Sequence, residues 1–293
     1  MVYKKSLGER LFDLFNHILM LVLIFITLYP CYYVVVASLS DPVQIYSASG
    51  LLFYPKGFSI AAYIDVINHK QLWIGYANTL YYTGVGGGLS VLCTIISAFA
   101  LTRKDLPGKN GIIFAMMFTM YFHGGLVPMF LIVKSLGLLD TRTWMLIHGL
   151  VTTYNLIITM SYFRGLPAEL EEAAKVDGAG DYTVLFKIMI PLAKPIIAVM
   201  ALYYMVAIWN NFMTALIYLS DRNKFPLQLV LREILIQNST NDIAAVGNGA
   251  DAAAYAESMK FAVVVVSSVP VLCIYPFIQK YFVKGVMIGA VKG

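Results

Sequence analysis

The chain has 293 residues, of which 59% are hydrophobic and only 13% are charged, with a mean hydropathy of +0.74 and a formal net charge of +5. Soluble domains carry roughly 25% charged residues, so this composition excludes an ordinary soluble protein. The three cysteines, Cys31, Cys93 and Cys273, lie far apart in apolar sequence. Their spacing excludes both a disulfide framework and a zinc site.

Six long stretches without Asp, Glu, Lys or Arg predict membrane-spanning helices. A helix needs roughly 20 apolar residues to cross the hydrocarbon core, and the stretches lack the apolar–polar alternation of barrel strands. We expect an all-α polytopic membrane protein in which residues 1–293 form a single transmembrane domain. The expected spans cover approximately residues 12–40, 71–102, 110–133, 143–163, 195–220 and 260–280.

The basic residues predict the orientation of the chain. Lys4, Lys5 and Arg10 precede the first span, and Arg103, Lys104 and Lys109 lie between the second and third spans. Short loops rich in Lys and Arg stay on the cytoplasmic side, so both termini are expected in the cytoplasm. The first apolar block is too long for a cleaved signal peptide and is expected to remain as a helix.

The spans contain few groups that could carry protons or metals. All 16 carboxylates lie outside the charge-free stretches, the first of which runs from residue 14 to 40, and this argues against a proton-coupled carrier. His17, His123 and His148 fall within or at the ends of spans, but no two of them share an i, i+4 pairing with a carboxylate or Cys. We expect them to be structural, and we expect no metal.

Residues 84–88, Gly-Val-Gly-Gly-Gly, form a glycine-rich run inside an apolar span. The run lacks the G-x-x-x-x-G-K-[ST] pattern that holds phosphates, and small residues there favour close helix packing. If the protein uses ATP, another polypeptide must therefore bind it.

Three connections are long enough to carry function: residues 41–70, 164–194 and 221–258. The second predicts a short cytoplasmic helix, because Pro167 suits a helix start and Glu169 and Glu171 complement the helix dipole. Gly178 suits a left-handed stop. From chemistry alone this helix could be a docking element or an ordinary amphipathic loop helix.

The same loop contains a spaced motif. Its residues are Glu172, Ala173 and Ala174, then Gly178, then Ile188, Ile190 and Pro191. This pattern resembles the EAA motif of ABC importer permeases, with Ile190 where that family commonly has Leu. The similarity continues through Trp209-Asn210-Asn211-Phe212 and the glycine-containing end at 284–293. The chain resembles the second, smaller permease of maltose-type carbohydrate importers, and most of all those for oligosaccharides from alginate, pectin or xylan.

This resemblance implies a type I ABC importer permease in a bacterial inner membrane. Its partners would be a second permease, two ATPase subunits and a solute-binding protein. The chain would not be an enzyme and would bind no cofactor, since ATP and magnesium would lie on the ATPase. Residues 168–178 would form the coupling helix, Glu172 its charged contact, and 285–293 a tail between the ATPase subunits. The implied coupling residues are Glu172, Ala173, Ala174, Asp177, Gly178, Ile188 and Pro191.

Two further sets of residues are candidates for contact with cargo or binding protein. The fifth span offers stacking rings and amides that suit sugars, although such residues also join membrane helices. These are Tyr203, Tyr204, Trp209, Asn210 and Asn211. By resemblance, the outer loop at 221–258 would probe the binding protein through Asn241, Gly247, Asn248, Gly249 and Asp251.

Two other classes of function remain open. A sodium-coupled carrier would need broken helices in matching repeat halves, and Pro270 and Pro276 interrupt only the sixth span. A membrane scaffold would need no ATPase partner, but it leaves the spaced motif unexplained. The outer loops are nearly balanced in charge, so charge does not choose between acidic and neutral sugars.

Overall fold

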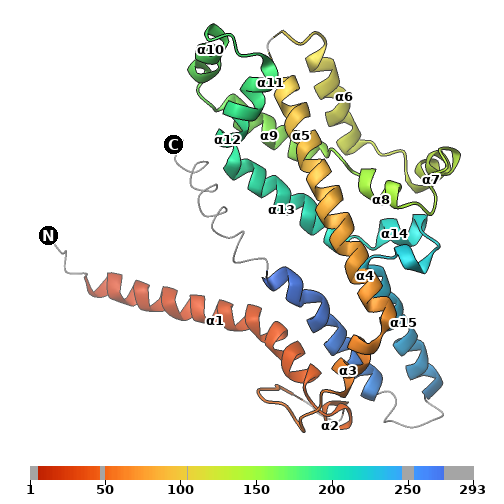
Figure 1. Ribbon diagram of the computed structural model, residues 1–293. Helices are drawn as coiled ribbons and strands as arrows, with labels where there is room; N and C mark the ends of the chain where they lie inside the picture. The colour runs from red at the N-terminus through yellow and green to blue at the C-terminus, as the bar shows by residue number, and fades with distance from the viewer. Residues whose placement is uncertain (1–5, 47–49, 104, 246–253, 274–293) are drawn as a thin grey trace. The chain divides into compact units, whose positions relative to one another are not determined.

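A computed structural model describes residues 6–46, 50–103, 105–245 and 254–273, and the side chains of all of these except 237–245 (Figure 1). The chain forms two compact units. The first comprises Met1–His69 and Leu231–Pro270, and the second comprises Lys70–Val230 and Val271–Gly293. The described residues are helical and contain no named strand, only an isolated antiparallel bridge between Ser40 and Phe58. This agrees with the expected all-α class.

The first unit is built on one long apolar helix. Its elements are α1 (Leu7–Ser38), α2 (Pro42–Tyr46), α3 (Ala61–Asn68) and a helix over Ala254–Cys273. Ser6 and Glu9 form a capping box that starts α1, with Ser6 N donating to Glu9 Oε2 at 2.7 Å. The most apolar part of α1 has no side chain buried inside the protein. Such a surface is stable in lipid and unfavourable in water.

The end of α1 packs into a small core. Val36, Ala37, Ile45 and Leu52 are buried together, and Phe261 packs against them. The hydroxyl of Tyr29 accepts a hydrogen bond from the backbone N–H of Leu52 at 2.8 Å. These contacts fix the loop after α1 to the helix Ala254–Cys273.

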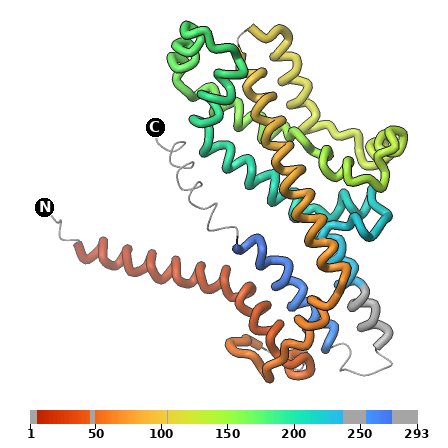
Figure 2. Tube along the Cα trace, viewed as in Figure 1, coloured from red at the N-terminus to blue at the C-terminus, as the bar shows by residue number. Residues whose placement is uncertain are grey.

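The second unit contains a continuous helix over Lys70–Thr102, which the tube trace follows without interruption (Figure 2). It consists of α4 (Lys70–Tyr81), the π-helical turn η1 (Tyr82–Gly86) and α5 (Gly87–Thr102). The π turn overlaps the first three residues of the glycine-rich run, 84–86, and Gly87 and Gly88 begin α5. A Cβ at Gly87 would lie 3.1 Å from Met205 Cγ, and one at Gly86 3.5 Å from Leu146. The predicted close packing is therefore confirmed at these two glycines.

The core of this unit surrounds α5. Helices α9 (Thr153–Arg164) and α13 (Lys194–Asn210) pack against α5, as Figure 1 shows. Their contacts bury Phe99, Leu156, Val184 and Met200, among others. The second unit therefore has a continuous apolar interior from α5 to α13.

Three of the expected spans are divided, including residues 195–220, which form α13 and α14 (Met213–Tyr218). Residues 110–133 form α6 (Lys109–Tyr121) and α7 (Leu126–Ser135), whose axes differ by 119°. Residues 143–163 form α8 (Arg142–Ile147) and α9. Gly125, just before α7, and Gly149, two residues after α8, have φ of +86° and +72°, which lies outside the right-handed helical conformation. The described residues include three helices long and apolar enough to cross a membrane, or up to five if each bent pair is one span, so six spans remain a prediction.

The remaining elements of the second unit follow α9 in chain order. The joint before α13 bends by 83°. Helix α15 (Leu227–Ala245) begins in the second unit and passes the boundary at Val230. The others are α10 (Ala168–Val176), α11 (Asp181–Thr183), η2 (Val184–Met189), α12 (Ile190–Leu192), α14 (Met213–Tyr218) and η3 (Arg222–Lys224).

Candidate functional site

Helix α10 is the short helix that the sequence predicts in the 164–194 loop. Pro167 occupies the cap position just before it, and Glu169 and Glu171 lie in its first turn. Gly178 has φ +80°, as expected for a left-handed stop. The N–H of Ala179 donates to Ala174 O at 2.9 Å, which satisfies one of the last carbonyls of the helix.

The two faces of α10 differ in their surroundings. Ala174 is only 9% exposed and belongs to the core around α5. Glu172 and Ala173 are exposed, and Val176 is 87% exposed. Residues three or four apart share one face of a helix, so the outward face carries Glu172, Ala173 and Val176. An exposed valine beside a small residue and a charge suits a protein partner.

The inward face of α10 carries an ion-pair cluster. Glu171 pairs with Arg103 at the end of α5 and with Lys175 one turn along, the latter at 2.9 Å. The guanidinium of Arg103 stacks over Phe99, 4.1 Å from the ring centroid. A cavity of about 330 Å³ adjoins the cluster, lined by Thr102, Arg103, Asp105, Ala168, Glu171, Glu172 and Lys175.

The cluster also shifts the ionisation of its members. Burial pushes the pKa of Glu171 upward, but hydrogen bonds from Lys175 and Arg103 outweigh it and hold the pKa below its usual value. The hydrogen bond to Glu171 raises the pKa of Lys175. Both groups are therefore charged at neutral pH.

The other residues of the spaced motif divide between core and surface. Ile188 and Ile190 lie in η2 and α12 and pack against the core around α5. Asp177, Gly178 and Pro191 are exposed. A Cβ at Gly178 would meet no atom within 4 Å. Only backbone conformation, and not space within the described chain, demands glycine at this position.

The candidate pathway residues on α13 do not share one surface. Tyr204 is 3% exposed, and its hydroxyl is hydrogen-bonded to Thr94 Oγ1 at 2.6 Å and accepts from Thr152 N at 3.1 Å. Tyr203 is exposed and lies beside Tyr154, with ring centroids 6.5 Å apart. Tyr204 therefore joins α5 to the start of α9, whereas Tyr203 presents its ring outward.

The other three pathway candidates lie at the end of α13. Trp209 is buried, and Asn210 donates from its side chain to Val206 O at 2.9 Å. Asn211 binds Thr214 twice, through Nδ2 to Oγ1 at 2.8 Å and through Oδ1 from the backbone N–H at 3.0 Å. Asn211 thus shapes the turn into α14, while Asn210 is exposed.

Most of the expected binding-protein loop is outside the described residues. This holds for Gly247, Asn248, Gly249 and Asp251. Asn241 lies within α15, but its side chain is not described. The tail at 285–293 is also outside the described residues.

The three histidines have separate surroundings. His17 bonds the carbonyl of Asp13 through Nδ1 at 2.5 Å. His123 and His148 line a cavity of about 440 Å³ between α7 and α14, together with Thr214 and Tyr218. Within the described ranges, no three His, Cys, Asp or Glu residues are grouped as metal ligands would be.

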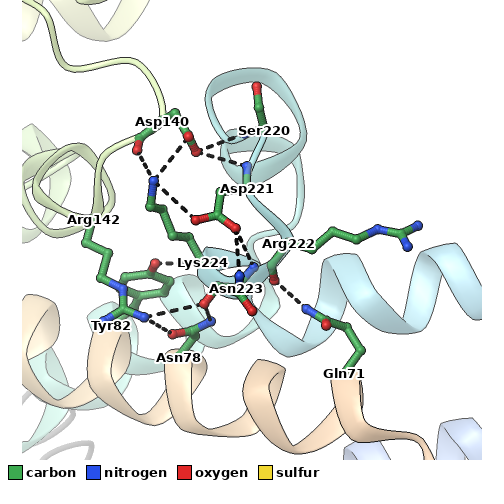
Figure 3. A network of polar contacts seen from close by, with 10 residues as sticks. All are labelled: Gln71, Asn78, Tyr82, Asp140, Arg142, Ser220, Asp221, Arg222, Asn223 and Lys224. Atoms are coloured by element: carbon green, nitrogen blue, oxygen red, sulfur yellow. Dashed lines mark hydrogen bonds and ion pairs between the residues drawn. The ribbon is translucent and has the colours of Figure 1, made fainter.

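A second polar cluster, which sequence reasoning missed, centres on Asp140 (Figure 3). Asp140 has φ +54°, and its Oδ1 accepts from the N–H groups of Ser220 and Asp221, both at 3.1 Å. Lys224 Nζ donates to Asp140 O at 2.7 Å and Oδ2 at 3.1 Å, and pairs with Asp221 at 3.5 Å. These bonds fix the turn after α14 to the loop before α8.

The same turn is fixed to α4. Asn78 donates to Asn223 O at 2.8 Å and accepts from Arg142 at 3.1 Å. Tyr82 donates to Lys224 O at 2.8 Å, and Gln71 donates to Arg222 O. Figure 3 shows these side chains converging from α4, α8 and the turn. The cluster at Asp140 therefore joins three elements that are far apart in sequence.

Comparisons with known proteins identify the family. Residues 90–288 match the model of the "Binding-protein-dependent transport system inner membrane component". The polygalacturonan/rhamnogalacturonan transport system permease protein YtcP of Bacillus subtilis is 38% identical over 97% of this chain and 99% of its own length. The chain belongs to this family of inner membrane transport permeases.

Other relatives agree with this assignment. Protein LplC of Bacillus subtilis is 37% identical over 97% of the permease and 96% of its own length. A crystal structure titled as a bacterial ABC transporter involved in the import of the acidic polysaccharide alginate has a TM-score of 0.85 and 33% identity. The match covers 96% of the permease and 100% of the chain in that crystal structure. The family resemblance seen in the sequence is confirmed, and the sodium-coupled carrier has no support.

Two signals in the permease sequence could have revealed the missed contacts. Arg103 indicates orientation, but it also lies at the end of a span, where a partly buried guanidinium needs a partner. Asp140 precedes a short polar run and, like Asn and Gly, tolerates the left-handed conformation. Neither signal names its partner, because each partner lies more than 60 residues away.

Proposed function

We propose that this permease is one half of the translocation pathway of an ATP-driven oligosaccharide importer, coupled to an ATPase through α10. The observation that carries the proposal is the division of α10 into an inner face held by the core and an outer face carrying Glu172, Ala173 and Val176. That outer face contains Glu172 and Ala173 of the spaced motif, whereas Ala174 lies on the inner face. Glu172 makes no ion pair or hydrogen bond within the described residues and is available to a basic group on the ATPase.

The remaining features of the assembly are part of the same proposal. The whole chain acts as one permease domain with six spans and both termini in the cytoplasm, which the basic residues beside the first three spans support. A second permease completes the pathway, and a solute-binding protein delivers the cargo. ATP and magnesium bind to the ATPase, since the glycine-rich run of this chain forms a helix turn packed against Leu146 and Met205.

We propose acidic oligosaccharides as the cargo. The relative YtcP is named for polygalacturonan and rhamnogalacturonan, and the matched crystal structure is titled for alginate. An arabinooligosaccharide permease, AraQ of Halalkalibacterium halodurans, is less similar, at 28% identity. For sugar contact, the exposed Tyr203 and Asn210 are better placed than the buried Tyr204 and Trp209.

Gly178 provides the test of coupling. Gly178→Trp places a large ring at the outer end of α10, where the described chain leaves open space, so it should detach the ATPase by blocking its approach. Gly178→Ala imposes the same left-handed backbone strain, about 1–2 kcal/mol, without the bulk. The measurement is mass spectrometry of proteins that co-purify with the tagged permease in mild detergent.

The expected result is an ATPase and a second permease with the wild type, loss of the ATPase with Gly178→Trp, and its retention with Gly178→Ala. Membrane insertion of all three proteins is checked by measuring the amount of each in the membrane fraction. Wild-type permease isolated alone, under conditions that keep such complexes intact, would contradict the proposal. Full ATPase recovery with Gly178→Trp would exclude α10 as the docking element.

A further inference from the structure

The ion pair between Arg103 and Glu171 is the polar link between α10 and the long helix that ends at Thr102. Glu171 also pairs with Lys175, but Lys175 is on α10 itself. Arg103 directly follows α5, so its contact with Glu171 crosses from one element to the other. A pair within one helix stiffens that helix, whereas a pair between helices makes them move together.

Arg103 is itself held firmly at the end of α5. Its guanidinium stacks on Phe99, one turn earlier on the same helix, and Phe99 is buried in the core around α5. Its backbone carbonyl accepts from Lys109 Nζ at 2.9 Å, which also ties the start of α6 to this point. Arg103 therefore follows any displacement of α5.

The pair is partly withdrawn from solvent. The side chains of Arg103 and Glu171 are 16% and 22% exposed, and Arg103 Nε is buried without a hydrogen-bond partner among the described residues. Ion pairs are screened less when they are withdrawn from water, and the loss of one member leaves the other charge poorly solvated. Arg103 thus depends on Glu171 for its neutralisation.

The neighbouring glutamates of α10 face different ways. Glu171 faces Arg103 at the end of α5, and Ala174 is buried in the core that α5 shares with η2, whereas Glu172 and Val176 are exposed. The residues that would meet a partner and the residues that hold the helix are therefore separate. Because of this separation, a displacement of the outer face is transmitted to α5 by residues that the partner does not contact.

We propose that Arg103 and Glu171 are positioning residues that make α10 and α5 move as one body when the ATPase closes. This inference rests on the proposed coupling role of α10. Ala174 anchors α10 in the shared apolar core, and the ion pair links α10 directly to the end of α5. Without the pair, α10 stays docked on the ATPase but slides relative to α5.

The test measures the distance between α10 and α5 in the assembled transporter. Spin labels are attached at Glu169→Cys on α10 and Ile96→Cys on α5, both exposed positions, in a background where Cys31, Cys93 and Cys273 are replaced by Ser. Distances between the labels are measured by double electron–electron resonance, without nucleotide and after trapping with ATP and vanadate. Co-purified ATPase and its basal hydrolysis are measured on the same samples.

In the wild type we expect one narrow distance distribution that vanadate trapping leaves unchanged. Glu171→Gln and Arg103→Gln should broaden the distribution and shift it on trapping, while the ATPase stays bound. Arg103→Lys retains the charge and should stay close to the wild type. Asp105→Asn removes a carboxylate from the same cavity and is the matched control, with no expected change.

The outcomes separate this inference from the proposed function. Unchanged narrow distributions in Glu171→Gln and Arg103→Gln would overturn the positioning role, and so would loss of the bound ATPase in these variants. Absence of an ATPase from the wild-type preparation would instead contradict the proposed function itself. A thermal melting curve for each sample shows whether a variant has simply lost its fold.

Discussion

Tyr204 illustrates how the burial of a single side chain distinguishes between two roles, sugar contact and helix packing. The sequence favours it as a sugar contact, but its hydroxyl joins Thr94 on α5 to the N–H of Thr152 before α9. A buried hydroxyl with two hydrogen-bond partners is costly to remove, because the partners lose their hydrogen bonds as well. We infer that its first role is to join helices.

Tyr204→Phe should therefore lower the free energy of unfolding by about 1–2 kcal/mol. Thermal melting of the purified permease in detergent measures the change. Tyr203→Phe is the matched control, since its ring is exposed, and it should leave the melting temperature unchanged. A Tyr204→Phe permease with normal melting but impaired uptake would instead place Tyr204 on the sugar path.

Gly178, Glu171 and Glu172 show how far single residues can be assigned from sequence. The left-handed stop at Gly178 follows from local backbone rules, and it is confirmed. Which glutamate pairs inside the chain does not follow, because adjacent helix positions point about 100° apart and only the neighbouring element decides between them. The charged contact of Glu172 with a partner remains a prediction.

At the scale of elements, the turn over η3 is held by one central ion pair. Hydrogen bonds from Asp221 and Ser220 hold the pKa of Asp140 below its usual value of 3.8, and bonding to Asp140 raises the pKa of Lys224 above 10.5. The stabilisation from Asp140 is thus present above pH 3.8 and is lost as the pH falls through its lowered pKa. The contribution of Lys224 is present below pH 10.5 and is lost at more alkaline pH.

Asp140→Asn keeps the residue type that tolerates φ +54° and removes the charge. At neutral pH it should lower the melting temperature by a few degrees, and this difference should shrink as the pH falls below 3.8. Lys224→Met should have a similar effect, and the double variant should lose no more than either single variant. Additive losses would show that the two side chains act independently.

The helices themselves were predicted with uneven success. The long apolar stretches over Leu7–Ser38 and Lys70–Thr102 form continuous helices, although the first contains Pro30 and the second contains the π turn η1. The stretches at 110–133 and 143–163 are divided at glycines with positive φ. Composition alone counts both kinds as spans, since hydropathy records the environment of a segment and not its direction.

For the whole molecule, the proposed cargo class predicts a measurable difference in uptake between an acidic and a neutral trisaccharide. We expect ATP-dependent uptake of trigalacturonate by the reconstituted complex with its binding protein to exceed uptake of arabinotriose at least about tenfold, a difference of about 1.4 kcal/mol. Proteoliposomes with and without internal ATP give the comparison. Equal uptake of the two trisaccharides would contradict the acidic cargo, and preferential uptake of arabinotriose would reverse it.

The helix over Lys70–Thr102 is a rigid rod that is anchored nearer to its first residue than to its last. Tyr82, at the start of the π turn, is bonded to the cluster at Asp140, whereas α5 beyond that turn is 16 residues long and thus about 24 Å. A tilt of about 10° at the turn would carry Arg103 about 4 Å sideways at the far end. That distance is comparable to the length of an ion pair. A small movement of α10 at one end of the helix would therefore tilt α5 about the point that the cluster at Asp140 holds in place.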